Sequence, residues 1–507
     1  MLGAKVHRRI FLVLLTLLAG CMVTSRGMGN VVWVLMAANW LLEGRWKEKW
    51  AMAKTSRALP AFIALYLAYA AGILWSPDMG KGLANLEIRL PMLVVPLVLL
   101  TTPPPSGRTR SIILWLYAGT VLVVSLIGAA RLATIPDLPY RSAVPFMSHT
   151  RFALNCCVVI FLCLLEPPAG RWRYVGYALA LWLLTYQMLL HSYTTLAILT
   201  IGSLGLLVWL RRWRGLAVWM GAVGVMVALV AIGCRSYYRL IPQATGPLAA
   251  ATANGRPYTH KQDGFVENGN YVTNYLCEEE MWQQWPRRSH ASLDSVTAGG
   301  FTLMPVLVRY LNALGLPKDS AGVAALTDDQ VREIERGIPT PVYAHGSYPK
   351  RMLHVMLFEY ESYRHYHAVE GFTMLQRLEL WRATLSVIRQ HPWLGVGTLN
   401  VRHSMREEMR KTGSPMAESD LFPHNQYLTW TAMFGLVCLS VVLLLFLRAF
   451  PDLRHQRPLL VAWLLVVLIS FLTEDTLGSL VGRLFCLWPL AIRTPKEAPP
   501  DNDHVTV

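Results

Sequence analysis

Long apolar stretches, separated by short polar or proline-containing joins, dominate the chain. A membrane-spanning helix needs about 20 apolar residues, and segments near this length recur along most of the sequence. The candidate spans are residues 9–25, 29–43, 58–75, 88–102, 111–130, 150–166, 173–191, 193–210, 215–233, 427–448, 458–473 and 476–492. The pattern predicts an all-α polytopic membrane protein with about 12 transmembrane helices.

One long polar segment, residues 234–426, interrupts this pattern between the ninth and tenth spans. It contains helix signals, so a large, mainly helical domain is expected. Thr327 and Gln330 have the spacing of a capping box, which predicts a helix start. Residues 373–390 also predict a helix, whose apolar stripe is typical of core packing and consists of Leu375, Leu378, Trp381, Leu385 and Ile388.

The distribution of basic residues predicts the orientation of the chain. Twenty Lys and Arg residues fall in the joins and ends on one side, against six in the short loops on the other. Because cytoplasmic loops carry the excess of positive charge, both termini are expected in the cytoplasm. The predicted domains are residues 1–233 with transmembrane helices 1–9, a periplasmic domain at 234–426, helices 10–12 at 427–493, and a disordered cytoplasmic tail at 494–507.

Composition agrees with a membrane protein. Hydrophobic residues make up 54% of the chain and charged residues only 15%, against about 25% for soluble domains. The net charge of +16 comes from short basic runs between apolar stretches, which indicates cytoplasmic loops in contact with membrane lipids. No basic helix or stacking motif suggests nucleic acid, so no nucleic-acid partner is expected.

The cysteines and the N-terminus add little chemistry. No CxxC or His-rich spacing is present, so we expect neither a metal nor another cofactor. Residues 17–21 end in Ala-Gly-Cys21, which resembles a lipoprotein cleavage site. Many apolar segments follow, and we therefore favour an uncleaved first helix over a cleaved signal peptide.

Two polar patches are expected at the outer mouths of the early spans. His149 and Arg151 lie at the start of the sixth span, where Arg151 is either an interfacial anchor or a clamp for an anion such as phosphate. Residues 191–195, with Tyr193, form the outer turn between two later spans. Such a turn matters only if it faces the same cavity.

Two further patches flank the end of the polar segment. Arg377 lies one helical turn before Trp381, so both side chains share a face. Residues 391–397 follow, with a proline and two glycines that end the helix. His424 and Asn425 come directly before the tenth span; a histidine there is either structural or a group that accepts a proton.

These residues resemble a known family. The stretch from Arg377 to Gly435 reads RLELW, HPWLGVG, PHNQYLTW and FG in order, and it resembles the O-antigen ligase and O-antigen polymerase superfamily of bacterial envelope glycan transferases. Residues 149–152, 268–311 and 472–477 resemble the Bacteroidetes-like branch of that superfamily.

The resemblance implies a reaction and a location. Such ligases move a glycan from undecaprenyl diphosphate to a hydroxyl of the lipid A-core, with inversion and without a metal, on the periplasmic face of the bacterial inner membrane. It implies that Arg377 holds the diphosphate and His424 assists the acceptor hydroxyl. The expected substrate-binding residues are Arg151, His149, Tyr193, Trp381, Asn425 and Glu474.

Two departures from the family pattern leave alternatives open. Tyr193 stands where many ligases carry an arginine, so one diphosphate contact is either missing or supplied by Arg151. Leu399 and Asn400 stand where this branch usually has Gly-Asp. A repeat-unit polymerase fits the same motifs, and so does a transferase acting on protein hydroxyls. A lipid-linked glycan transporter or flippase, or a membrane scaffold, is the alternative of another class.

Overall fold

The computed structural model describes residues 3–75, 78–135, 138, 140–190, 192–239, 248–261, 266–267, 270–297, 302–366 and 373–494. Helices dominate this part of the chain. The chain forms two compact units. The first combines Met1–Trp219 with Arg377–Val507, and the second is Met220–Gln376.

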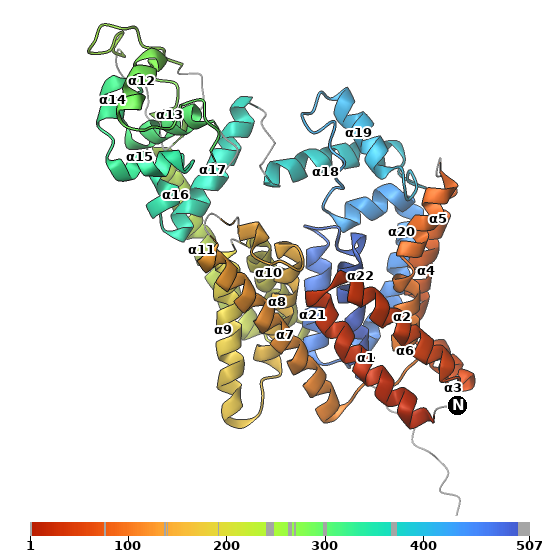
Figure 1. Ribbon diagram of the computed structural model, residues 1–507. Coiled ribbons are helices and arrows are strands. Elements are labelled where there is room, and N and C mark those ends of the chain that lie inside the picture. Colours follow the sequence, from red (N-terminus) through yellow and green to blue (C-terminus); the bar gives the residue numbers. More distant parts are fainter. Residues whose placement is uncertain are drawn as a thin grey trace, which may run out of the picture. The chain divides into compact units, whose positions relative to one another are not determined.

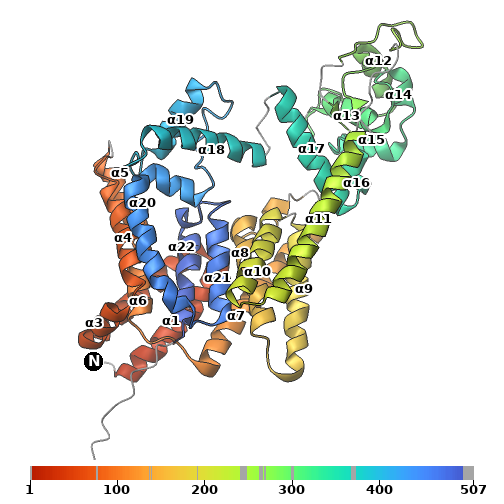
Figure 2. The same cartoon turned by 180° about the vertical axis from the view of Figure 1, so that it is seen from behind.

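The first unit is a helical bundle (Figures 1 and 2). Its N-terminal part comprises α1 (Ala4–Thr24), α2 (Arg26–Leu42), α3 (Trp46–Thr55), α4 (Leu59–Ala71), α5 (Met79–Ile88), α6 (Pro91–Leu100), α7 (Gly107–Thr134), η1 (Tyr140–Ser142), α8 (His149–Leu165), η2 (Gly170–Trp172), α9 (Arg173–Leu189) and α10 (Tyr193–Trp209). Its C-terminal part comprises α19 (Val401–Lys411), α20 (Gln426–Leu453), α21 (Pro458–Ser470), η4 (Thr476–Gly478), α22 (Leu480–Leu487) and η5 (Trp488–Ile492). Two helices run from one unit into the other along the chain: α11 (Trp213–Arg239) and α18 (Thr373–Gln390).

The helices coincide with the apolar segments that the sequence predicts as spans. Five are long and apolar enough to cross a membrane: Ala4–Thr24, Met79–Leu100, Gly107–Thr134, Trp213–Gly233 and Gln426–Leu453. Others, including α8 and α21, are apolar but shorter. The fold is therefore that of a mainly helical membrane protein, and the number of about 12 spans stays a prediction.

A buried aromatic stack holds distant parts of the bundle together. The Trp463 ring of α21 lies 5.6 Å from the Tyr117 ring of α7 and 5.1 Å from the Trp488 ring of η5, in stacked geometry. Both indole N–H groups donate to backbone carbonyls, Trp463 to Phe485 and Trp488 to Leu15. Each polar edge is thus satisfied, so these large rings can be fully buried.

α20 is broken at Gly435. The turn at residues 391–397, called here the glycine turn, forms backbone hydrogen bonds on both sides of this break. Gly435 has φ 68° and ψ 177°, far outside the helical region. The carbonyls of Ala432 and Met433 accept from the N–H groups of Val396 and Gly397, at 2.8 and 3.0 Å. On the other side of the break, the N–H groups of Leu436 and Val437 donate to the carbonyls of Pro392 and Trp393. The turn therefore satisfies the backbone groups that the break releases, which a membrane environment requires.

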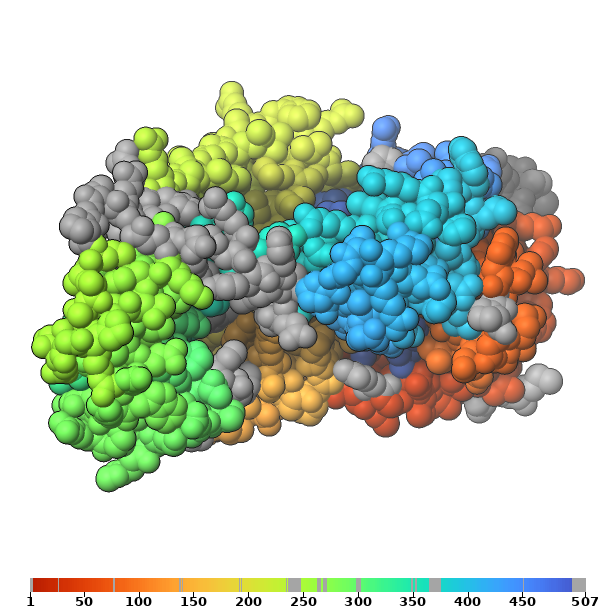
Figure 3. All heavy atoms as spheres, turned by 90° about the horizontal axis from the view of Figure 1, so that it is seen from above, coloured from red at the N-terminus to blue at the C-terminus, as the bar shows by residue number. Residues whose placement is uncertain are grey.

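The segment between this turn and α20 is fixed at both ends. At one end, the Thr398 hydroxyl donates to the Tyr69 carbonyl of α4 at 3.0 Å, and its N–H donates to the Gly72 carbonyl. At the other end, the Trp381 indole donates to the Pro423 carbonyl at 2.8 Å. Between these anchors the chain forms α19, which gives the exposed blue surface near residue 400 in Figure 3.

The helix at 373–390 is confirmed, and Leu375 of its predicted apolar stripe is buried, but the prediction is wrong for two other members. Leu378 and Leu385 are exposed by 44% and 41%. Besides Leu375, the buried positions are Leu380, Ala383, Thr384 and Val387. The apolar stripe did not predict the buried side because this side includes a polar residue, Thr384. The hydroxyl of Thr384 donates to the carbonyl of Leu380, which allows it to be buried.

The second unit combines small helices and a short hairpin. Its elements are β1 (Val266–Glu267), β2 (Asn270–Tyr271), α12 (Glu278–Gln284), η3 (Trp285–Arg287), α13 (Leu303–Leu314), α14 (Ser320–Ala324), α15 (Asp328–Glu335), α16 (Pro341–His345) and α17 (Tyr348–Tyr366). β1 and β2 pair antiparallel, with Val266 opposite Tyr271. The predicted capping box at Thr327 and Gln330 is confirmed at the start of α15.

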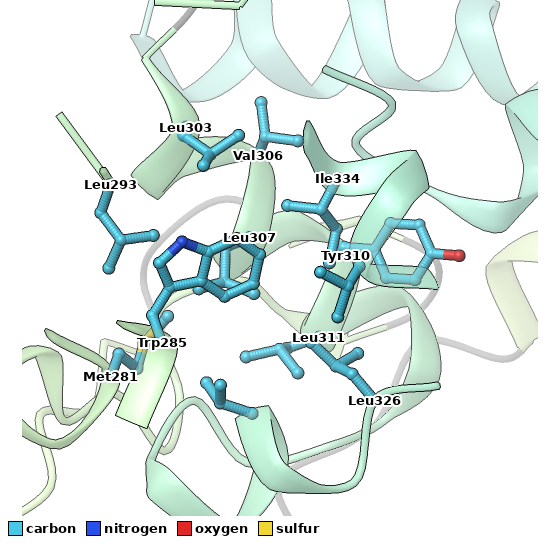
Figure 4. Close-up of a cluster of buried hydrophobic side chains, with 12 residues drawn as sticks. Met281, Trp285, Leu293, Leu303, Val306, Leu307, Tyr310, Leu311, Leu326 and Ile334 are labelled. Carbon is cyan, nitrogen blue, oxygen red and sulfur yellow. The ribbon is translucent and has the colours of Figure 1, made fainter. Parts of the chain in front are cut away.

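A separate apolar core supports this unit (Figure 4). The Trp285 ring is 1% exposed and packs among side chains of α13 such as Leu307 and Leu311. The Tyr310 hydroxyl, at the edge of the cluster, donates to Glu333 of α15 at 2.6 Å. The core thus brings α12, α13 and α15 together.

A buried ion pair joins β1 to α13. Arg309 donates twice to the fully buried Glu267 carboxylate, at 2.7 Å to each oxygen, and His354 of α17 lies 3.2 Å from it. Burial raises the pKa of Glu267, but its bonds with Arg309 and His354 outweigh burial and hold the pKa below its usual value. The carboxylate therefore depends on these partners to remain charged inside the unit.

Candidate active site

The backbone around His424 is held from three directions. His424 has φ 52°, a left-handed conformation that is uncommon outside glycine. Before it, the Pro423 carbonyl accepts from Trp381 of α18. After it, the Asn425 side chain caps α20 by accepting from the N–H of Leu428, and it donates to the Leu472 carbonyl at 3.2 Å. These anchors place the imidazole at the mouth of α20.

Glu474 joins His424 to Arg377. One carboxylate oxygen accepts from Nη2 of Arg377 at 3.0 Å, and the other lies 3.5 Å from Nδ1 of His424. Burial raises the pKa of Glu474, but the bond from His424 and the charge of Arg377 outweigh it. The pKa therefore lies below its usual value, and the site contains a carboxylate anion at neutral pH.

Asp475 is the second acid of the same turn, which lies between α21 and η4. The Thr429 hydroxyl of α20 donates to its carboxyl group. Burial, together with the neighbouring Glu474, raises the pKa of Asp475 to about 6. Two adjacent carboxyl groups therefore differ in acidity, because only Glu474 has a basic side chain bonded to it.

His149 and Arg151, at the start of α8, belong to the same electrostatic environment. The charges of Glu474 and Arg377 act on His149, and the charge of Arg151 acts on Glu474. The Arg151 carbonyl accepts from the Asn155 side chain at 2.8 Å, and this hydrogen bond stabilises the first turn of α8. The patch at His149 and Arg151, the patch at Arg377 and Trp381, and the patch at His424 and Asn425 thus gather around Glu474.

The remaining patch is only partly described. α10 begins at Tyr193, but the side chain of Tyr193 and the whole of His191 lie outside the described residues. The neighbouring Thr195 is buried and donates to the Gln187 side chain at 3.0 Å. The predicted role of Tyr193 in substrate binding stays a prediction.

Sequence analysis did not identify two buried arginines as candidate site residues. Arg483 of α22 is 2% exposed and donates to the Leu477 carbonyl at 3.0 Å. Arg89, after α5, is 8% exposed and lies over the Tyr69 ring at 4.5 Å. Among the described residues, neither forms an ion pair, and the charges of Arg89 and Arg151 both act on Arg483. The missed signal was an arginine inside an apolar segment, which is costly unless it serves a function.

The site thus places an excess of positive charge beside a histidine–carboxylate pair. Nε of Arg377, Arg89 and Arg483 is buried in each case and has no hydrogen-bond partner among the described atoms. Such guanidinium groups suit an anion with several oxygens. Within the described ranges, no group of three His, Cys, Asp or Glu side chains is arranged to hold a metal ion.

Comparison with known proteins assigns the segment that carries most of this site. A search of the curated proteins found no match to the chain. A protein-family model described as O-antigen ligase matches residues 352–443. This range contains Arg377, Trp381, the glycine turn, His424 and the break at Gly435. Over this segment, the chain is similar to the O-antigen ligase family.

Proposed function

We propose that the protein is an inverting, metal-independent O-antigen ligase. It moves a glycan from undecaprenyl diphosphate to a hydroxyl of the lipid A-core, on the periplasmic face of the bacterial inner membrane. The observation that carries the proposal is the cluster of His424, Glu474 and Arg377 among further buried arginines. The family match at residues 352–443 supports the same class of chemistry.

The arginines suit the donor. As the glycosidic C–O bond breaks, negative charge grows on the departing diphosphate, and preorganised positive groups stabilise that charge. Arg377 uses Nη2 for Glu474, which leaves its buried Nε for a phosphate oxygen. Arg151, Arg89 and Arg483 supply further positive charge nearby. This set takes the place of the arginine that is Tyr193 in this chain.

His424 suits the acceptor. A sugar hydroxyl is a weak nucleophile, and a base that takes its proton during attack accelerates the reaction. The His424 side chain is 34% exposed, so an acceptor can reach it. The new bond forms between the acceptor oxygen and the anomeric carbon, the proton passes to His424, and undecaprenyl diphosphate leaves from the opposite face.

The test is transfer by the purified protein in nanodiscs. The donor is an undecaprenyl-diphosphate glycan, the acceptor is a lipid A-core, and products are separated on a gel. We expect glycan on the acceptor with wild type and none with His424→Ala. His403→Ala is the matched control, because His403 lies on α19 with its side chain 70% exposed and forms an ion pair with Glu407. Arg377→Lys should retain more activity than Arg377→Ala, yet less than wild type, since lysine keeps the charge without the fork.

Other products would replace the proposal. A longer glycan still on the carrier would identify a polymerase. No product from folded protein with several donors would return attention to a transporter or a scaffold. Full activity in His424→Ala would remove His424 from the mechanism.

A further inference from the structure

Glu474 has a position that a simple substrate ligand would not require. It lies in the turn after α21, and its side chain is only 20% exposed. One of its oxygens is bonded to Arg377 and the other faces His424, at 3.0 and 3.5 Å. Both oxygens are therefore directed at protein groups.

The backbone of the same turn is bonded to the residues that follow His424 at the start of α20. The N–H of Gln426 donates to the Phe471 carbonyl at 2.8 Å, and Asn425 donates to the Leu472 carbonyl. In return, the Gln426 side chain accepts from the N–H of Leu477 at 3.0 Å. Residues on both sides of His424 and Glu474 are thus tied together, which sets the separation of the two side chains.

We infer that Glu474 is a positioning residue for His424 rather than a contact for the substrate. Its carboxylate holds the proton of His424 on Nδ1 and leaves Nε2 as the nitrogen that accepts the acceptor's proton. When that proton arrives, the imidazolium is stabilised by the same carboxylate. The second oxygen of Glu474 keeps Arg377 beside the base, so that donor and acceptor groups share one anchor. The kinetic part of this inference rests on the proposed function.

Glu474→Gln gives a specific expectation because the two neighbours of Glu474 differ. Arg377 has only donors, so the carbonyl of the new amide would face it and the amide NH₂ would face Nδ1 of His424. Nδ1 then becomes an acceptor, and the imidazole proton moves to Nε2, where it blocks proton uptake. We expect kcat to fall about 10- to 100-fold, as for loss of a hydrogen bond to a charged group. Since Arg377 loses a competing anion, KM for the donor should stay the same or fall.

A double variant separates positioning from substrate contact. If Glu474 acts through His424, then His424→Ala with Glu474→Gln is no slower than His424→Ala alone, in end-point assays over hours. Glu474→Asp, which keeps the charge, should recover part of the lost kcat. Glu418→Gln is the control, because Glu418 forms an exposed ion pair with Arg410 on α19. Multiplying effects in the double variant, or a raised donor KM at unchanged kcat, would overturn the inference in favour of a substrate ligand.

A second measurement does not depend on glycan transfer. Diethylpyrocarbonate modifies the unprotonated imidazole nitrogen, and mass spectrometry reads its rate at His424. Glu474→Gln should slow modification of His424 several-fold and leave His403 unchanged. An unchanged rate at His424 would refute the pairing. If wild type transfers no glycan, the proposed function fails, while this labelling still decides whether Glu474 controls His424.

Discussion

Replacing Gly435 with alanine is the most direct test of the broken helix. At φ 68° and ψ 177°, the residue occupies a region that is essentially restricted to glycine. A Cβ atom there would lie 2.2 Å from the carbonyl oxygen of Trp393 and 2.5 Å from the N atom of Leu394. Both are backbone atoms, so no rotation of a side chain can relieve the clash. The variant must move either α20 or the glycine turn.

The cost follows from the bonds that this movement breaks. Four backbone hydrogen bonds join the turn to the break, and each is worth about 1 kcal/mol. The strained backbone adds about 1–3 kcal/mol. If α20 instead straightens, its own groups pair again, but four groups of the turn at Pro392–Gly397 lose their partners. Either route predicts a loss on the order of 5 kcal/mol in the free energy of unfolding.

The assay is thermal unfolding of the detergent-solubilised protein, followed by fluorescence-detected size exclusion. Gly119→Ala in α7 is the matched control, because its Cβ would meet no atom within 4 Å, and we expect it to be neutral or slightly stabilising. Gly435→Ala should lower the apparent Tm by several degrees and also reduce glycan transfer, since α20 carries His424 at its start. An apparent Tm equal to that of Gly119→Ala would refute the account of the break.

Three further predictions concern other parts of the chain. Arg309→Met should destabilise the second unit by about 3–5 kcal/mol, because it leaves the buried Glu267 without its main partner, and chemical denaturation measures the loss. Asp475→Asn should raise the Tm at pH 8 but not at about pH 3.5. The pKa of Asp475 is raised from 3.8 to about 6, so its stabilising contribution is complete below the unfolded pKa, is lost as the pH rises from about 4 through 6, and amounts to at most about 3 kcal/mol; equal gains at both pH values would contradict this. Ser292→Cys, at an exposed position of the second unit, should react with a membrane-impermeant maleimide from the periplasmic side, and labelling only after the membrane is opened would reverse the topology.

Sequence reasoning predicted the helices well because hydropathy and capping act locally. The helix at 373–390 and the capping box at Thr327 both agree with the structure. Which side of a helix is buried is determined less by the local sequence. Leu378 and Leu385 looked like core residues, yet they are exposed while Thr384 is buried. Which face is covered depends on elements distant in sequence, so periodicity alone could not decide it.

For the candidate site, too, the sequence predicted which residues take part but not how they are arranged. The motifs contain Arg377, His424 and Glu474, but nothing in their spacing places Glu474 between the other two. That arrangement depends on the contact of the turn at Phe471 and Leu472 with the start of α20. The break at Gly435 was also missed, because a glycine in an apolar run is compatible with an ordinary helix until its partner segment is known.

The segment between Thr398 and Pro423 offers a practical handle. Because Thr398 and Pro423 are both hydrogen-bonded to other helices, an insertion in the loop or in α19 between them need not move either end. Gly413, at its tip, is exposed and has open space around it. Insertions are tolerated best at such exposed tips. A purification tag or a fiducial protein for electron microscopy can therefore be grafted beside Gly413.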